Sequence, residues 1–517
     1  MKPIRCAVLG RRLGTVIGAS AAVLLASTAV YAASLVAGKL VLVPDNPLAT
    51  GSSVCRQLVS QQIAQGSTNY PDAEVEPYVT ADPSNPAHLI ASFQQDRWND
   101  GGSNGLTNVV SFDGGASWQL ATTQPAFSIC EGAASGSAGY FNRATDPWVS
   151  FSADGKIAYS ISDSFNANGP GFGGASSIIV SRSTDGGLHW QAPVTAEFDA
   201  STTLLNDKES VTGDPLQALT AYAVWDRLVS PSSNANPSAF NVSPAFRGPA
   251  MFSKTIDGGV MWSPGRIIFD PGELNQTIGN QIVVPTAGAA AGQLIDGFDL
   301  IINLKGNPST PYSVAIIRSA DGGATWSGPT VISQQQLAKV FINGQYIRTS
   351  DELPEFAVGP QGNLYAVWQD RRFTGAAKIA LSMSTDGGAS WSQPIRVDQS
   401  PGNVPAFTPQ VHVASDGAVG VSYYGLENAT TSQPGLTDQF IVHCSASCDN
   451  PASWAGGGET RLSPKSFDML TAPVAVGPFV GDYEGLSSSG ATFDSFFVMA
   501  QPVAKHGKTD PFANTAG

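Results

Sequence analysis

Arginine, carboxylate and tyrosine side chains are the groups in this sequence with the clearest chemical potential. A guanidinium group pairs with a carboxylate through two parallel hydrogen bonds, so arginine is suited to recognising an acidic ligand. Aspartate and glutamate can transfer protons, and a tyrosine hydroxyl becomes a nucleophile when a neighbouring base activates it. The candidates of these types are Arg97, Asp146, Glu209, Arg348, Arg371 and Tyr483.

These candidates fall near the ends of predicted strands. Paired apolar runs are separated by short turns, as in residues 147–151 and 157–161, or 355–358 and 364–368. Such pairs indicate antiparallel hairpins. A third run and an octapeptide follow each pair, so each repeat predicts four antiparallel strands, A to D. The pattern predicts almost no helix.

The octapeptide Ser/Thr-x-Asp-Gly-Gly-x-x-Trp is the strongest motif. It occurs five times, and a degenerate sixth copy reads Ser-Cys-Asp-Asn-Pro-Ala-Ser-Trp. The aspartates are 63 to 72 residues apart. The Asp and Ser/Thr side chains can bond to turn amides, the glycines allow positive φ, and the Trp supplies an apolar plate. The copies occupy residues 111–118, 183–190, 255–262, 319–326, 384–391 and 447–454.

The repeat resembles the Asp box, or BNR repeat, of sialidase-like β-propellers. The resemblance implies an all-β propeller of four-stranded antiparallel blades, with Asp boxes in most blades. Inner strands expected near Glu76, Asp146, Glu209, Asn280, Glu352, Thr408 and Asp482 predict seven blades, with six as the alternative. Residues 76–503 are expected to form the propeller. Residues 33–75 are expected to complete the last blade, and residues 504–517 to form a polar tail.

The resemblance also implies where a site would lie. In such propellers the active face carries the starts of the A strands and the ends of the B strands. Read in the sialidase order, Asp146 is the acid, Tyr483 the nucleophile and Glu209 its partner. The carboxylate clamp would be Arg97, Arg348 and Arg371. Further substrate-binding candidates are Arg227, Glu352 and Tyr424.

The expected function is that of a glycoside hydrolase resembling an exo-α-sialidase, which cleaves terminal, including acidic, sugars from a glycan or glycoconjugate. The Arg-Ile-Pro motif of sialidases does not occur before the first octapeptide. Two alternatives therefore stay open. One is a non-catalytic propeller that binds glycans or proteins, and the other is a polysaccharide lyase acting on a uronate-containing glycan.

Residues 1–32 have the pattern of an export signal. Four basic residues precede an apolar run at 13–32, which ends in the small-x-small sequence Val30-Tyr31-Ala32. Four cysteines remain after cleavage, and their even number predicts two disulfides, Cys55–Cys130 and Cys444–Cys448. We expect a secreted or periplasmic monomer that is not membrane-bound after cleavage.

The composition restricts the partners. The 517 residues carry 41 acidic against 27 basic side chains, a formal charge of −14, which argues against nucleic-acid binding. No cofactor is expected apart from a structural Ca²⁺, for which Asp96, Asn99 and Asp100 are weak candidates because their side chains offer oxygen ligands.

Overall fold

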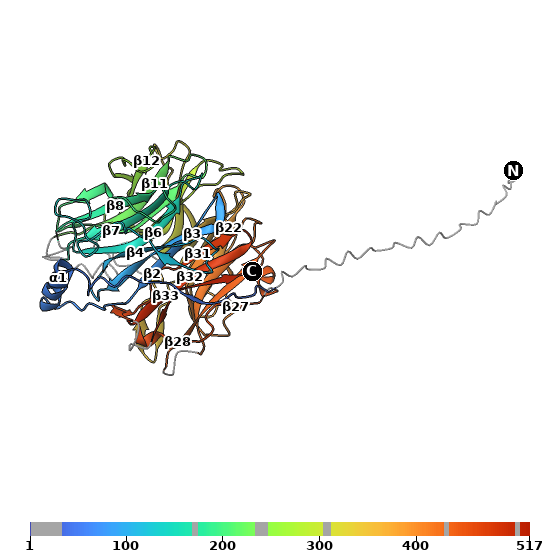
Figure 1. Ribbon diagram of the computed structural model, residues 1–517. Coiled ribbons are helices and arrows are strands. Elements are labelled where there is room, and N and C mark those ends of the chain that lie inside the picture. The colour runs from blue at the N-terminus through green and yellow to red at the C-terminus, as the bar shows by residue number, and fades with distance from the viewer. Residues whose placement is uncertain are drawn as a thin grey trace. The chain divides into compact units, whose positions relative to one another are not determined.

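Strands make up nearly all of the regular structure (Figure 1). The computed structural model describes Met1 and residues 34–167, 174–232, 247–302, 312–428, 434–456, 458–501 and 507–517. Apart from Met1, the predicted export signal lies outside these residues. The helices of the described part are short: α1 (Ser53–Ala64), α2 (Pro451–Ala455) and the 3₁₀ turn η2 (Met469–Thr471). No described helix is long and apolar enough to cross a membrane.

The strands form antiparallel sheets in which consecutive strands are neighbours, as the hairpin pattern predicts. The first sheet contains β2 (Val75–Asp82), β3 (Asn85–Arg97), β4 (Ser103–Ser111) and β5 (Gln119–Leu120). The second contains β6 (Arg143–Phe151), β7 (Ala158–Phe165), β8 (Ser176–Ser183) and β9 (Val194–Asp199). A single residue pair, Ser103 with Ala144, joins the two sheets.

The sheets that follow repeat this order. One comprises β10 (Leu204–Gly213), β11 (Ala221–Val229), β12 (Ala250–Thr255) and β13 (Arg266–Phe269). The next comprises β14 (Asn275–Val283), β15 (Leu294–Ile302), β16 (Tyr312–Ser319) and β17 (Thr330–Gln334). Then come β20 (Glu355–Val358), β21 (Leu364–Asp370), β22 (Lys378–Ser384) and β23 (Ile395–Arg396). The fourth of this group holds β24 (Ala406–Val413), β25 (Val419–Leu426), β26 (Leu436–Cys444), β27 (Thr460–Arg461) and β28 (Phe467–Asp468).

The C-terminal sheet contains strands from both ends of the chain. Its order is β1 (Val41–Leu42), β33 (Thr509–Ala516), β32 (Thr492–Ala500) and β31 (Gly485–Ser489). The polar tail expected over residues 504–517 is therefore wrong for Thr509–Ala516. This segment is polar in composition, yet it is mostly buried because β32 and β1 pair with its two edges.

The first strands of the sheets contact one another in sequence. β2 contacts β6, β6 contacts β10, and β10 contacts β14; β14 contacts β20, β20 contacts β24, and β24 contacts β31. β31 in turn contacts β2. Two short hairpins, β18 (Val340–Ile342) with β19 (Gln345–Ile347) and β29 (Val474–Ala475) with β30 (Gly477–Pro478), lie in the connections that precede β20 and β31.

The octapeptide turns share one hydrogen-bond pattern. In the first turn the Ser111 hydroxyl donates to Asp113 at 2.9 Å and accepts from the Gly115 amide at 3.0 Å. The Asp113 carboxylate accepts from the Ser117 amide at 2.8 Å. Equivalent bonds form in the turns of Asp185, Asp257, Asp321 and Asp386. These bonds satisfy turn amides, and the paired glycines have positive φ.

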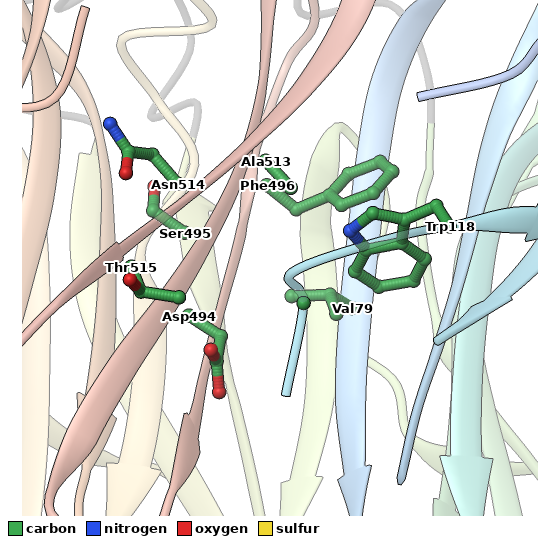
Figure 2. Close-up of a pocket in the computed structure, with 9 residues that line it drawn as sticks. Val79, Trp118, Asp494, Ser495, Phe496, Ala513, Asn514 and Thr515 are labelled. Carbon is green, nitrogen blue, oxygen red and sulfur yellow. The ribbon is translucent and has the colours of Figure 1, made fainter. Parts of the chain in front are cut away.

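The tryptophan of the first octapeptide packs between sheets. Figure 2 shows the indole of Trp118 facing the ring of Phe496 in β32, with Val79 of β2 beside them. The two ring centroids are 5.1 Å apart in an edge-to-face arrangement. This contact joins the first described sheet to the C-terminal sheet through apolar surface.

Both predicted disulfides are confirmed. Cys55–Cys130 ties α1 to the long connection between β5 and β6. Cys444–Cys448 closes the end of β26. There the degenerate octapeptide, with Asn-Pro in place of Gly-Gly, forms α2, because Asn450 caps the helix and Pro451 starts it.

Candidate functional site

A bulge recurs near the start of the first strands. At each one the pairing register shifts and one residue takes a positive φ: Glu76 (53°), Asp146 (51°), Lys208 (49°), Gly279 (71°) and Thr408 (49°). Each of these strands extends to both sides of its bulge. The strands β2, β6, β10, β14 and β24 therefore begin one to five residues before the starts predicted from the sequence. Left-handed backbone is costly for residues other than glycine, and such strain concentrates at functional sites.

Two of the bulge residues, Glu76 and Asp146, meet with Asp482 around the ammonium group of a third bulge residue, Lys208. The Lys208 Nζ lies 2.6 Å from Asp146 Oδ1, 3.1 Å from Glu76 Oε1 and 2.7 Å from Asp482 Oδ2. These residues come from β10, β6, β2 and the segment before β31. Together with Arg348 we call them the Lys208 cluster. The Lys208 side chain is 10% exposed and that of Glu76 is fully buried, so the cluster is nearly closed to solvent.

Burial disfavours the charged forms of both Lys208 and Glu76. Burial alone would lower the pKa of Lys208, but Asp146, Asp482 and Glu76 together hold it well above its usual value. Burial raises the pKa of Glu76 despite the nearby Lys208 ammonium. Glu76 also accepts a hydrogen bond from Gln94. The three carboxylates therefore keep the Lys208 ammonium charged, while burial opposes ionisation of Glu76.

Arg348 and Ser350 hold Asp482 from the other side. The Arg348 guanidinium donates to both Asp482 oxygens, at 2.9 and 2.5 Å, and the Ser350 hydroxyl also donates to it. Burial opposes ionisation of Asp482, but Arg348 and Lys208 hold its pKa well below the usual range. Asp482 is consequently a fixed anion that organises two cations.

Arg97 supports the cluster from beside it. Its guanidinium donates to Gln94 Oε1 at 2.6 Å, and Gln94 donates to Glu76. Arg97 and Arg348 both lie over the Phe479 ring, 5.0 and 4.5 Å from its centroid. The structure thus brings two of the three predicted clamp arginines together, with Lys208 as a third cation that the sequence analysis did not identify.

Tyr483, the predicted nucleophile, lies against the cluster with its hydroxyl engaged elsewhere. The hydroxyl donates to the Pro147 carbonyl at 3.0 Å, and the ring lies 5.6 Å from Lys208 Nζ. Burial, followed by the carboxylates around it, raises the pKa of Tyr483 well above the usual value. This environment disfavours a phenolate.

Glu209, the predicted partner of Tyr483, forms its described hydrogen bond elsewhere. Its Oε1 accepts from the Asp163 amide, and its Oε2 is buried with no hydrogen-bond partner among the described residues. Burial, Asp146 and Asp163 raise the pKa of Glu209 well above the usual range. Burial and these two carboxylates therefore disfavour ionisation of Glu209, beside the cluster.

Asp207 is a site residue that sequence reasoning missed. It directly precedes Lys208 on the β10 bulge, its side chain is partly exposed, and its Oδ1 accepts from the Lys208 amide at 3.1 Å. Burial and the negative charge of Asp146 raise the pKa of Asp207 to about 7. The sequence Asp207-Lys208-Glu209 could have indicated this residue, because three consecutive charged residues are unusual in an inner strand.

The remaining predicted ligand contacts lie apart from the Lys208 cluster or at its edge. Arg371 is exposed, and Arg227 pairs with Glu197 and Asp199. Tyr424 is buried and donates to the Val498 carbonyl at 2.8 Å. Glu352 is partly buried near Arg348 and Asp482. Burial and Asp351 raise its pKa to about 7.

The three calcium candidates use their oxygens for protein donors. Asp96 accepts from the amides of Leu48 and Ala49, which anchors the N-terminal segment. Asp100 accepts from Arg143 and Ser67, each at 2.6 Å. Asn99 accepts from the Thr68 amide at 2.7 Å. Each side chain has a structural role in the connections around α1.

The chain is similar to several solved structures. No protein-family model and no curated protein matches the chain. The NanB sialidase from Streptococcus pneumoniae is 9% identical over 87% of this chain and 94% of that one, with a TM-score of 0.45. The intramolecular trans-sialidase from Ruminococcus gnavus is 14% identical over 73% and 96%, with a TM-score of 0.41. An α-L-arabinofuranosidase from Fusarium graminearum is 13% identical over 75% and 93%, with a TM-score of 0.42.

Proposed function

We propose that the protein is an exported glycoside hydrolase that cleaves a terminal sugar at the Lys208 cluster. The observation that carries the proposal is the position of Asp207 directly before Lys208, whose ammonium lies 2.6 Å from Asp146 Oδ1 and 2.7 Å from Asp482 Oδ2. The carboxyl groups gathered here are also tuned in opposite directions. The pKa of Asp482 is held well below its usual range, and that of Asp207 is raised to about 7. Neighbouring groups whose pKa values are pushed apart are typical of acid–base catalysis.

We infer that the fold beneath this site is a closed ring of seven sheets. The contacts that run from β2 through the other first strands to β31, and from β31 back to β2, support the ring. The turns that carry the octapeptides then lie at one end of the sheets, and the bulges with the long connections lie at the other. The Lys208 cluster would be at the axis, where residues from several sheets can reach one ligand.

Asp207 is the proposed proton donor. Glycoside hydrolysis requires a carboxylic acid that protonates the leaving oxygen, together with an ionised carboxylate near the anomeric carbon. Asp207 combines partial exposure with a pKa near neutrality. Asp146, paired with Lys208 at 2.6 Å, is the proposed ionised carboxylate.

The cations of the cluster have a positioning role in this proposal. Lys208 fixes carboxylates from separate sheets, and Arg348 keeps a side-chain exposure of 20%, so it can reach a sugar hydroxyl or carboxylate. In this proposal Tyr483 supports Lys208 with its ring, and its hydroxyl, which donates to the Pro147 carbonyl, does not act as the nucleophile. The mechanism therefore differs from the sialidase order expected from the sequence.

A non-catalytic glycan-binding propeller is the second candidate. It is favoured by the pairing of Lys208 and Arg348 with carboxylates, which leaves little net charge for an acidic sugar. The two candidates differ in whether a bound glycan is turned over.

Hydrolysis of a panel of fluorogenic glycosides tests the proposal. The panel should include α-sialosides, α-L-arabinofuranosides and β-glucuronides, assayed with the wild type and with Asp207→Asn. Asp494→Asn is a matched control, because Asp494 is a buried aspartate whose pKa is also about 7, on β32 beside the first octapeptide turn. We expect wild-type turnover that falls about 100-fold or more in Asp207→Asn and persists in Asp494→Asn.

Binding on a glycan array without turnover of the same glycans would instead establish the second candidate. Turnover that survives in Asp207→Asn would overturn the assignment of the proton donor. Release of an unsaturated uronate from a 4-linked, uronate-containing polysaccharide would indicate a lyase and contradict hydrolysis, because β-elimination breaks the C4–O bond.

A further inference from the structure

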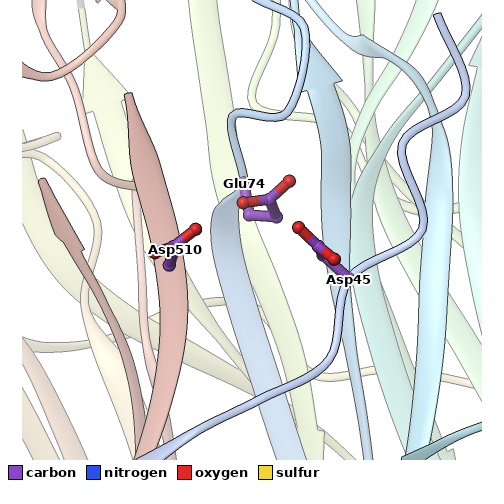
Figure 3. A group of neighbouring side chains, drawn as sticks. All are labelled: Asp45, Glu74 and Asp510. Atoms are coloured by element: carbon purple, nitrogen blue, oxygen red, sulfur yellow. The ribbon is translucent and has the colours of Figure 1, made fainter. Parts of the chain in front are cut away.

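A second group of carboxylates joins three distant segments of the chain. Asp45 precedes β2 in the N-terminal segment, Glu74 immediately precedes β2, and Asp510 lies in β33 (Figure 3). One carboxylate oxygen from each residue lies within 4.8 Å of those from the other two. We call these residues the Asp45 cluster. It lies where the N-terminal segment, the first sheet and the C-terminal sheet meet.

Glu74 provides an oxygen that the protein leaves unsatisfied. Its side chain is completely buried, and Figure 3 shows its carboxylate between those of Asp45 and Asp510. Oε1 accepts a hydrogen bond from Gln95, whereas Oε2 is buried with no hydrogen-bond partner among the described residues. An unsatisfied buried carboxylate oxygen is costly, so a ligand that binds it would recover that cost.

The surroundings of Glu74 add negative charge. Apart from burial, the groups that act most strongly to raise its pKa are Asp45, Asp510, Asp72 and Asp96, all of them carboxylates. The Asp72 Oδ1 atom is also buried with no hydrogen-bond partner among the described residues, and the charges of Asp45, Asp510 and Asp96 act on it as well. Carboxyl groups gathered in this way are stabilised by protons or by a cation among them.

We propose that the Asp45 cluster binds a Ca²⁺ ion, with Asp72 as an additional ligand. Calcium is coordinated by oxygen at about 2.3–2.6 Å, so two of its ligand oxygens are at most about 5 Å apart. The spacing of the cluster fits this limit. Magnesium usually keeps several waters and binds through one or two carboxylates, so a site built from three or four carboxylates suits calcium better.

The ion would strengthen the junction between the two ends of the chain. β1 is only two residues long and pairs with β33 through Val41 and Leu42. A cation bound by Asp45, Glu74 and Asp510 would tie the segment after β1 directly to β2 and β33. Calcium binding is therefore expected to resist separation of the first and C-terminal sheets.

Thermal unfolding with and without calcium tests the proposal on the whole purified protein. After removal of metal with a chelator, CaCl₂ at about 100 times the dissociation constant should raise Tm by about 3 °C, whereas MgCl₂ should raise it less. Metal analysis after gel filtration should find about one bound calcium per chain.

Two variants make the test specific. Glu74→Gln keeps the side-chain shape and should lose the calcium-dependent rise in Tm. Asp45→Asn changes a partly exposed residue and should lose most of it, so it serves if Glu74→Gln does not fold. Asp494→Asn, a buried aspartate outside the cluster, should keep the full rise.

Three results would overturn the proposal. The first is a metal-free wild type whose Tm does not respond to calcium, which would indicate that protons balance the carboxylates. The second is an equal or larger response to magnesium. The third is an unchanged calcium response in both Glu74→Gln and Asp45→Asn.

Discussion

The Lys208 cluster and the Asp45 cluster place three carboxylates at similar spacing but surround them differently. In both groups a carboxylate oxygen from each of three residues lies within 4.8 Å of the others. In the first, the Lys208 ammonium contacts all three carboxylates, and Arg348 holds Asp482 from outside. In the second, the strongest charges around Glu74 are all negative.

This difference shows how one arrangement of carboxylates can serve two purposes. A side chain that supplies the cation makes a permanent network, in which each pKa is set by the protein. A group in which the described charges on one carboxylate are all negative, as around Glu74, can draw instead on solution cations or on protons. We therefore expect the Lys208 cluster to respond to pH through catalysis and the Asp45 cluster to respond to calcium through stability.

Replacement of the central cation should have the largest effect. Lys208→Met removes the charge and keeps a chain of similar length, so Glu76, Asp146 and Asp482 would face one another without compensation. Removal of one partner from a buried ionic network costs about 3–5 kcal/mol in the free energy of unfolding. Urea unfolding measures this loss.

Lys156→Met is the control, because the Lys156–Asp154 pair lies on the surface with Lys156 80% exposed. Its free energy of unfolding should change little. An equal change in both variants would contradict the importance that we assign to Lys208. A new calcium response in Lys208→Met would sharpen the comparison, because the vacated centre would then resemble the Asp45 cluster.

Catalysis should be lost on the basic side of neutrality. A proton donor acts only while it is protonated, and the pKa of Asp207 is about 7 in the folded protein. The kcat of the wild type should therefore be full at pH 5.5 and decline about tenfold for each pH unit above 7. The check is a profile of kcat from pH 5 to 9, and a rate that stays constant up to pH 9 would exclude Asp207 as the donor.

The sequence predicted much of the fold because the octapeptides make local contacts. The Ser, Asp and Gly residues of each copy bond within one turn, so eight residues determine its shape. The strand at Thr509–Ala516 could not be predicted in this way. It depends on pairing with β32 and with β1, which lies more than 450 residues earlier in the chain.

Stability should decrease with rising pH when calcium is absent. The folded pKa of Asp72 is about 7, above its usual value of 3.8, because of burial and, after it, the charges of Asp45, Asp510 and Asp96. A raised carboxyl pKa means that the folded state binds the proton more tightly, so this stabilisation is complete below pH 4 and is lost as the pH rises through 7.

Calcium should reduce the part of this slope that comes from the Asp45 cluster. Tm measured at pH 5, 6, 7 and 8, with chelator or with calcium, gives the two slopes for the wild type and for Asp45→Asn. We expect calcium to flatten the wild-type curve and to leave that of Asp45→Asn nearly unchanged. Parallel wild-type curves would contradict the link between the carboxylates and the metal.

The site was predictable in part for a related reason. The position of Asp146 and Asp482 at strand starts followed from the repeat, and both belong to the Lys208 cluster. The role of Lys208 did not follow, because its partners lie up to 274 residues away. The same limit applies to Tyr483 and Glu209, whose hydrogen bonds depend on Pro147 and Asp163 in other sheets.

Removal of the Tyr483 hydroxyl should have the smallest effect. Tyr483→Phe loses one buried hydrogen bond to the Pro147 carbonyl and keeps the ring against Lys208. The free energy of unfolding should fall by about 1 kcal/mol. Urea unfolding provides the measurement, and a loss as large as that in Lys208→Met would show that the hydroxyl is part of the ionic network.

The most direct test of the proposed reaction centre is a comparison of kcat for the wild type, Asp207→Asn and Tyr483→Phe on the best substrate of the panel. The account predicts a loss of about 100-fold or more for Asp207→Asn and a change within about threefold for Tyr483→Phe. A collapse of kcat in Tyr483→Phe with activity retained in Asp207→Asn would contradict it and would establish Tyr483 as the nucleophile.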